Sequence, residues 1–235
     1  MEKRLRIYAA PLLATCLLAA GPAVAAGSGD ANTTSAVAAT ADNSGPQGLV
    51  NEAVSVVQQM GKDPQLKQLM QKAKGIYIVP DFGRGALVVG ARGGEGVMLV
   101  HQDDTWSGPA FYNMGGISIG AQAGGSAGEI AFLLMSENAV NNFLSQNTFS
   151  LNAGAGLTIV NYSANKQASW GKGDVIVWSD TEGAYAGASV SATDINWDED
   201  SNRQYYNQQQ VSPTAVLNGQ VTNASAEPLQ EALPG

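Results

Sequence analysis

The chain has 235 residues, of which 44% are hydrophobic and only 14% are charged. This composition fits one folded domain with flanking segments and excludes wholesale disorder. The 12 Lys and Arg against 20 Asp and Glu give a net charge of −8, which argues against general binding to nucleic acids. A single Cys and a single His exclude a Cys/His zinc cage and an intramolecular disulfide framework, and we expect no cofactor.

The first 25 residues have the anatomy of a signal peptide. Three basic residues precede the apolar run 7–20, and Ala23-Val24-Ala25 supplies the small residues of a cleavage site. The run is shorter than the roughly 20 residues that a membrane-spanning helix needs. We therefore expect an exported protein, periplasmic or associated with an outer membrane. The alternative is a lipoprotein attached through Cys16, because Leu13-Ala14-Thr15-Cys16 resembles a lipidation motif apart from its Thr.

The rest of the chain divides into three segments by composition. Residues 26–47 are small and polar without periodicity, which is typical of a flexible linker. Residues 208–235 contain a Gln triplet, three prolines and few apolar residues, and we expect a disordered tail there. The folded domain is then predicted to span residues 48–207.

Two short helices are predicted at the start of this domain. Apolar residues recur every three or four positions from Leu49 to Met60, which is the period of one helical face. Asp63 and Pro64 are suited to the N-cap and first turn of a second helix. The apolar stripe of that helix consists of Leu66, Leu69, Met70 and Ala73. Core packing is the simpler interpretation of the stripe, and contact with a membrane is the alternative.

From Gly75 onward the hydrophobic period is that of β-strands. Gly93-Gly94 is expected to form a tight turn between the second and third strands, and Ser136 to cap one inserted helix. Several strands have one very small face, which would let sheet layers approach closely or floor a shallow lipid groove. The predicted strands span 76–79, 86–91, 96–100, 117–123, 129–135, 151–160, 174–178 and 184–190. The fold class is therefore α+β: β-rich, with mainly antiparallel sheet layers, two short N-terminal helices and one inserted helix.

An ordered series of short segments between residues 48 and 207 resembles the SYLF domain. The series comprises Lys72–Pro80, Gly90–Val97, Trp106–Pro109, Gly115-Gly116 with Gln122 and Gly124, Asn138-Ala139 with Phe143, Gly183–Gly187, and Asp198 with Asn202 and Tyr205-Tyr206. The resemblance implies a non-enzymatic lipid-binding module: eukaryotic relatives bind phosphoinositides and some bind actin filaments, while bacterial relatives are often exported. Ser191-Ala192-Thr193 and Asn207 depart from the family pattern.

Short strings that resemble catalytic or metal-binding motifs lack the context they need. Ser118 and Ser126 each stand in a Gly-x-Ser-x-Gly string, but the only histidine, His101, precedes both and is expected at the surface end of a strand. A serine hydrolase is therefore a distant third hypothesis. The alternating acidic and amide residues of 194–200 resemble a calcium loop without its Gly and terminal Glu, so a solvated acidic loop is expected.

Basic residues gather in one part of the sequence. Only Asp63 and Asp81 oppose them between residues 62 and 92, which leaves that stretch at +4. Loss of residues 1–25 removes three basic groups and one acidic group, so nine and nineteen remain and the rest of the mature chain is at −14. The candidate lipid-binding residues are Lys62, Lys67, Lys72, Lys74, Arg84 and Arg92.

This polarity favours an oriented encounter with an anionic phospholipid membrane, in which the basic end approaches and the acidic body is repelled. Ordinary solubilising charge that happens to cluster would give the same pattern, and the resemblance to the SYLF domain favours lipid binding over it. The predicted function is therefore an exported lipid-binding module acting at the cell envelope. The alternative is a structural or protein-interaction domain of the envelope that docks partners on its glycine-lined sheet face. Actin is a partner by family analogy only, and no nucleic acid is expected.

Overall fold

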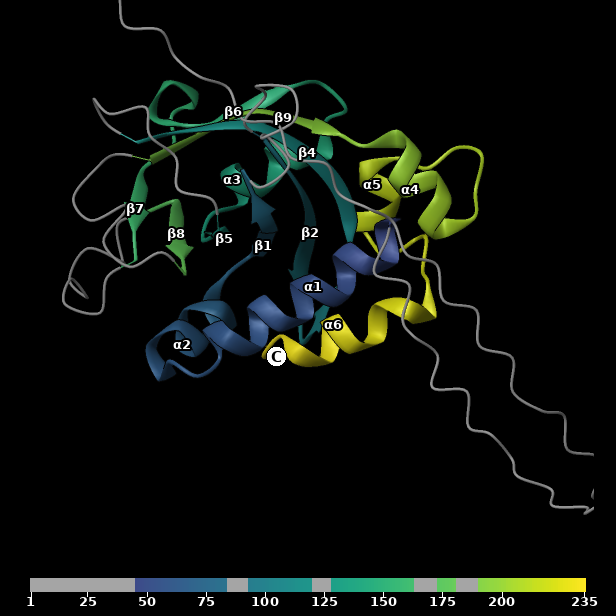
Figure 1. Cartoon of the computed structure of the whole chain (residues 1–235), viewed down its shortest axis with the longest axis horizontal. Helices are drawn as coiled ribbons and strands as arrows, with labels where there is room; N and C mark the ends of the chain where they lie inside the picture. The colour runs from purple at the N-terminus through teal and green to yellow at the C-terminus, as the bar shows by residue number, and fades with distance from the viewer. Residues whose placement is uncertain (1–44, 84–92, 120–127, 163–172, 181–189) are drawn as a thin grey trace, which may run out of the picture. The chain divides into compact units, whose positions relative to one another are not determined.

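Nine strands form one sheet in the part of the chain that the computed structural model describes, which is residues 45–83, 93–119, 128–162, 173–180 and 190–235 (Figure 1). The strand order is β6-β9-β4-β2-β1-β5-β8-β7, with β3 paired to β2. Every pairing is antiparallel except that of β7 with β8. The strands are β1 (Gly75–Phe82), β2 (Gly94–Gln102), β3 (Thr105–Trp106), β4 (Ala110–Ile119), β5 (Gly128–Leu134), β6 (Phe149–Leu151), β7 (Ile159–Asn161), β8 (Val175–Ser179) and β9 (Val190–Trp197).

Helices flank the sheet, and the predicted β-rich α+β class is confirmed. The α-helices are α1 (Gly45–Met60), α2 (Pro64–Lys72), α3 (Glu137–Asn141), α4 (Glu199–Tyr206), α5 (Pro213–Leu217) and α6 (Glu227–Ala232). Short 3₁₀ turns add η2 (Asn142–Leu144), η3 (Ala153–Ala155) and η5 (Ala224–Ala226). Among the described helices, none has the length and apolar character to cross a membrane.

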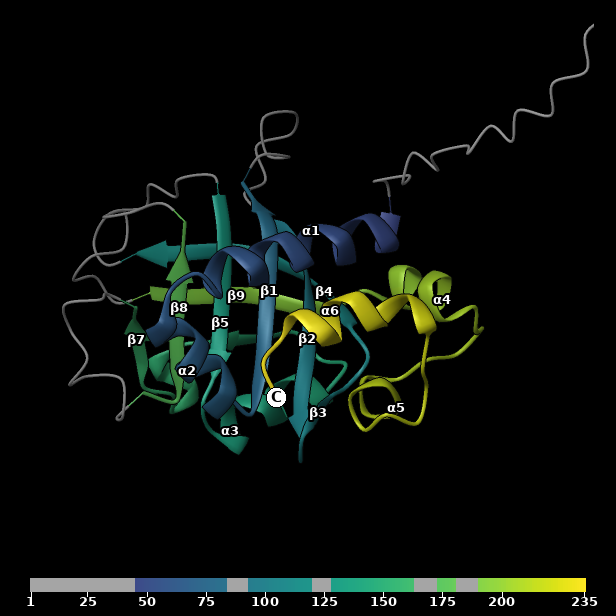
Figure 2. The ribbon, with the colours of Figure 1, turned by 90° about the horizontal axis from the view of Figure 1, so that it is seen from below.

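The two faces of the central strand β1 pack against different layers, because successive side chains of a strand point to opposite sides. Tyr77 stacks on Phe132 and packs against Phe143 of η2, with ring centroids 5.9 and 5.2 Å apart. A Cβ at Gly96 would lie 2.6 Å from the Tyr77 ring, so only glycine leaves room for this ring on β2. On the opposite face, α1 runs across β1 and β2 with α6 beside it (Figure 2).

Helix α2 is built as the sequence predicts. Asp63 is its N-cap and accepts a hydrogen bond from the backbone N–H of Gln65 at 2.8 Å, and Pro64 follows in the first turn. Leu66, Leu69 and Met70 are buried in the hydrophobic core, as is Ala73 just beyond the helix. The interpretation of this stripe as core is therefore confirmed, and the stripe has no free apolar surface for a membrane.

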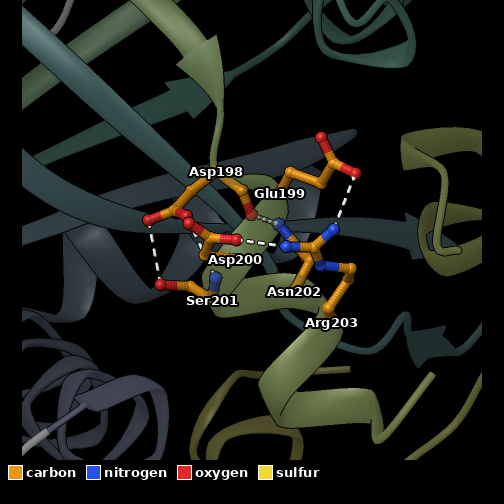
Figure 3. A network of polar contacts seen from close by, with 6 residues as sticks. All are labelled: Asp198, Glu199, Asp200, Ser201, Asn202 and Arg203. Carbon is orange, nitrogen blue, oxygen red and sulfur yellow. Dashed lines mark hydrogen bonds and ion pairs between the residues drawn. The ribbon is translucent and has the colours of Figure 1, made fainter. Parts of the chain in front are cut away.

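A side-chain amide joins α4 to the sheet. Asn202 is fully buried; its Oδ1 accepts from the N–H of Phe111 at 3.1 Å, and its Nδ2 donates to the Phe111 carbonyl at 2.8 Å. The same Nδ2 donates to the carbonyl of Asp198, whose carboxylate caps α4 by accepting from Ser201 (Figure 3). Asn202 thus takes the place of a neighbouring strand beside Phe111, where β9 has ended.

The expectation of a disordered tail is wrong, because residues 208–235 carry α5 and α6 and close the core. Val216, Leu217 and Leu229 are completely buried. Side-chain amides bridge this segment to the β2–β3 hairpin: Gln102 donates to the carbonyl of Leu217 at 2.7 Å, and Gln230 to that of Trp106 at 2.8 Å. The folded unit therefore extends to the end of the chain, and α1 begins at Gly45, inside the expected linker.

Three further local predictions are also wrong. Gly94 lies in β2 opposite Met114 instead of in a turn, while the amide of Gly83 donates to the carbonyl of Gly93. The predicted strand 151–160 is interrupted by η3, because the side chain of Asn152 caps that turn. The expected acidic loop 194–200 is the end of β9 followed by α4. The predicted strand 86–91, the signal peptide, and most of the small-faced residues of 117–123 and 184–190 lie outside the described residues.

Candidate functional site

Four of the six candidate lysines and arginines lie together at α2. Lys62 precedes the helix, Lys67 and Lys72 are on it, and Lys74 follows it; all four are exposed. We call these four residues the α2 cluster. Arg84 and Arg92 lie outside the described residues. Gly83 and Gly93, which flank the segment that carries them, stand at the opposite end of β1 from Lys74.

The exposed face of α2 carries cations and amides. At about 100° per residue, Lys67 and Lys72 are about 140° apart around the axis and border this face on its two sides. Gln68 and Gln71 occupy the surface between them and are exposed. The N-cap Asp63 is the one acidic residue of the helix and its caps. The outer surface of α2 is therefore suited to an anionic partner that lies flat against it.

Most of the α2 cluster is electrostatically unsatisfied. Lys74 forms an ion pair with Glu137 at 3.5 Å, but the two side chains are 53% and 72% exposed, so the pair is weak. Within the part of the chain that the structure describes, the side chains of Lys62, Lys67 and Lys72 take part in no ion pair. Three ammonium groups are thus available to a ligand.

Both oxygens of the Asp63 carboxylate accept hydrogen bonds from the protein. One oxygen accepts from the Gln65 N–H, and the other accepts from the hydroxyl of Tyr162, which follows β7. Partial burial alone would raise the pKa of Asp63, but the hydrogen bonds from Tyr162, Gln65 and Leu66 hold it below its ordinary value. Burial and the neighbouring carboxylate raise the pKa of Tyr162. Asp63 is therefore ionised at neutral pH, with its charge directed inward.

The sites proposed for other chemistry do not assemble in the described residues. Ser118 lies within β4 opposite Ser191 of β9, in an antiparallel ladder and not at a strand-to-helix elbow; Ser126 lies outside the described residues. His101, expected at a surface strand end, is half-buried and stacks on Trp106 at 4.6 Å. No group of three His, Cys, Asp or Glu that could hold a metal ion occurs among the residues described.

The end of the chain borders α2, which the sequence did not predict. Gln71 donates to the carbonyl of Gly235 at 3.5 Å, and the indole of Trp106 donates to that of Pro234 at 3.0 Å. The only sequence signal for a helix next to this end was the four-residue spacing of Leu229 and Leu233, which are both buried. It is too short a pattern to identify a helix against the three prolines nearby.

Comparison with known proteins gives one family and several eukaryotic relatives. The model of the Ysc84 family, described as "Las17-binding protein actin regulator", matches residues 115–235. Protein YSC84 of Saccharomyces cerevisiae is 31% identical over 168 residues, covering 68% of this chain and 36% of that protein. An SH3 domain-containing protein of Schizosaccharomyces pombe is 29% identical over 172 residues, covering 70% and 40%. SH3 domain-containing YSC84-like protein 1 of Bos taurus is 27% identical over 198 residues, covering 79% and 55%. The chain thus spans less than two thirds of the length of these relatives.

Proposed function

The chain belongs to the Ysc84 family, the family of the SYLF domain, and on that premise we propose that it is a non-enzymatic module that binds anionic phospholipid surfaces through the α2 cluster. One observation carries this proposal: α2 presents amides and cations outward, the cations of Lys67 and Lys72 have no ion-pair partner among the described residues, and the apolar stripe is buried in the core. The binding surface is therefore rigid and cationic.

Because α2 has no apolar face to insert, its attraction to a membrane is electrostatic. Each lysine held near an anionic surface contributes up to about 1 kcal/mol, so the three unpaired lysines set an upper bound of about 3 kcal/mol. At physiological salt this attraction extends about 8 Å, which restricts it to charges lying against the surface. The negative charge of the remaining chain opposes any other orientation. Binding is weak, oriented and released by salt.

The proposal places the protein at the cell envelope, in the periplasm or on the outer membrane. The support is the basic start, apolar run and small-residue cleavage site of residues 1–25. A phosphate-bearing head group of the phosphoinositide type suits the cluster, since an ammonium group attracts phosphate as a point charge. Attachment through Cys16 would supply a second membrane signal to a weak electrostatic one.

Vesicle co-sedimentation tests this function. Lys67→Gln/Lys72→Gln should lower binding to anionic vesicles by about one to two kcal/mol, or roughly tenfold, and neutral vesicles should bind neither protein. The matched control is Lys166→Gln/Lys172→Gln, which changes the net charge equally outside the cluster and should have much less effect. Equal binding to neutral and anionic lipid, or equal losses in the two double variants, would show that the α2 cluster is not the lipid site.

A protein-interaction function is the second candidate, and the extent of the family match favours it. The matched residues 115–235 do not include α2, and the family description refers to protein partners. A partner of this chain would then dock on the part of the fold that residues 115–235 form. Co-sedimentation with actin filaments, unaffected by Lys67→Gln/Lys72→Gln, would support this function; absence of the chain from the filament pellet would count against the actin form of it.

A further inference from the structure

An expected ion pair at the start of α2 is not made. Asp63, the N-cap, and Lys67 are four residues apart with the acid on the N-terminal side, the spacing and order that favour an ion pair when both residues lie on a helix. The backbone is already in place, since the N–H of Lys67 donates to the carbonyl of Asp63 at 3.0 Å. Yet the ammonium group of Lys67 takes part in no ion pair within the residues that the structure describes.

The side chain that takes the place of Lys67 is Tyr162. Its hydroxyl donates to the second oxygen of Asp63, while the first oxygen accepts from the N–H of Gln65. Tyr162 directly follows β7, the edge strand, and its own N–H donates to the carbonyl of Val177 in β8 at 2.7 Å. The sheet therefore fixes the position from which this hydroxyl reaches α2.

We propose that Tyr162 is a positioning residue that holds the Asp63 carboxylate away from Lys67 and so keeps the Lys67 ammonium group free for an anionic ligand. The inference deepens the proposed function and rests on it. A hydroxyl satisfies the carboxylate without bringing a second charge, whereas a lysine that satisfied it would be neutralised locally. The same acid can thus cap α2 and leave the cationic face of the helix intact.

The test combines two conservative substitutions with vesicle binding. Tyr162→Phe removes only the hydroxyl, which frees one carboxylate oxygen for Lys67, so binding to anionic vesicles should fall about two- to fivefold, at most the effect of one lysine. Asp63→Asn keeps a good N-cap and removes the charge. The double variant Asp63→Asn/Tyr162→Phe should therefore bind as well as Asp63→Asn alone. A purely structural role of Tyr162 predicts that the double variant stays as weak as Tyr162→Phe.

A second measurement needs no lipid. Trace acetylation of the folded protein, followed by peptide mass analysis, gives the reactivity of Lys67 relative to Lys72. This ratio should fall in Tyr162→Phe, because an ion-paired amine is less available, and recover in the double variant. An unchanged ratio in Tyr162→Phe overturns the inference. If Tyr162→Phe does not fold, Asp63→Asn decides: the ratio should equal that of the wild type, and a rise means that Asp63 already pairs with Lys67.

The two readouts separate this inference from the proposed function. If the wild type binds anionic vesicles but Tyr162→Phe binds equally well, the role assigned to Tyr162 is wrong and the lipid function stands. If no variant binds vesicles while the acetylation ratio changes as expected, the lipid function fails and the role of Tyr162 in freeing Lys67 stands.

Discussion

Replacing Asn202 by alanine should weaken the fold far more than its single amide suggests. The side chain makes three hydrogen bonds, two to Phe111 and one to the carbonyl of Asp198, and is fully buried. In Asn202→Ala the N–H of Phe111 loses its acceptor, and an unsatisfied buried donor costs about 1–3 kcal/mol. The Phe111 carbonyl keeps the bond from the N–H of Asp198 at 3.1 Å, which limits the remaining loss. We expect a total of about 2–4 kcal/mol.

Urea unfolding followed by tryptophan fluorescence measures this loss as a change in the free energy of unfolding. The matched control is Asn142→Ala, since Asn142 donates one exposed hydrogen bond to the carbonyl of Asn138 at 2.8 Å and should cost less than about 0.5 kcal/mol. If Asn202→Ala unfolds within about 0.5 kcal/mol of the wild type, the amide does not substitute for a strand and the reasoning is refuted.

Asn202→Asp separates hydrogen bonding from side-chain shape. At neutral pH a carboxylate would direct charge at the carbonyls of Phe111 and Asp198, so it should destabilise at least as much as alanine. This environment raises the pKa of the introduced carboxyl in the folded state above the unfolded value of about 3.9. The carboxyl therefore contributes its full stability below the unfolded pKa, where it is protonated and can donate a hydrogen bond. This stability is lost as the pH rises through the folded pKa. The deficit relative to wild type should shrink on acidification.

Two further outcomes test other parts of the fold. Burial raises the pKa of Tyr77, with Glu95 adding to the effect, and burial also raises that of Tyr112. Their pKa values in the folded state exceed the unfolded value of about 10, so the stability that these residues give is complete below pH 10 and is lost as the pH rises. The absorbance of their tyrosinate forms should therefore appear only when the circular dichroism of the folded protein is lost. A chain ending at Asn207 should melt at a lower temperature, with the fluorescence of Trp106 shifted to the red, because α6 and the Pro234 carbonyl that accepts a hydrogen bond from this indole are gone. An unshifted spectrum and melting temperature would mean that residues 208–235 add nothing to the core.

Local signals account for the parts of the fold that the sequence predicted. Asp63-Pro64 and Ser136 are capping residues whose hydrogen bonds depend on neighbours within three positions, and both caps form as expected. The strands around Tyr77, Phe132 and Val177 are continuous apolar runs, because the sheet is covered on both faces where they lie.

The failed predictions involve residues whose partners are distant in the sequence. The end of β9 is polar, so Asp194 and Asn196 read as a loop, and only pairing with β4 makes them a strand. Asp194 adopts a φ of 55° and lies close to Gly115 of β4. A Cβ added at Gly115 would lie 2.7 Å from the Cβ of Asp194, so this approach requires glycine. The C-terminal segment contributes isolated buried leucines, and its helix α6 packs against α1, which is far away in the sequence.

The candidate site was predictable where its residues are close in sequence. The lysines of the α2 cluster are close in sequence, so one helix keeps them together. That Asp63 would be engaged by Tyr162, 99 positions later, could not be foreseen, because no local pattern links a strand-end tyrosine to a helix cap.

The pairing of β4 with β9 also bears on how fast the chain can fold. Ile117 stands opposite Ala192 in the β4–β9 register, and β1 lies between β2 and β5, so the sheet depends on contacts between distant segments. Such a topology folds slowly, because the entropy of closing long loops is lost before the contacts that compensate it are made. Until β9 and the C-terminal segment arrive, the apolar strands at the centre are uncovered and prone to association with other chains. The weakly apolar segment 208–235 thus completes the protection of the strongly apolar strands at the centre of the sheet.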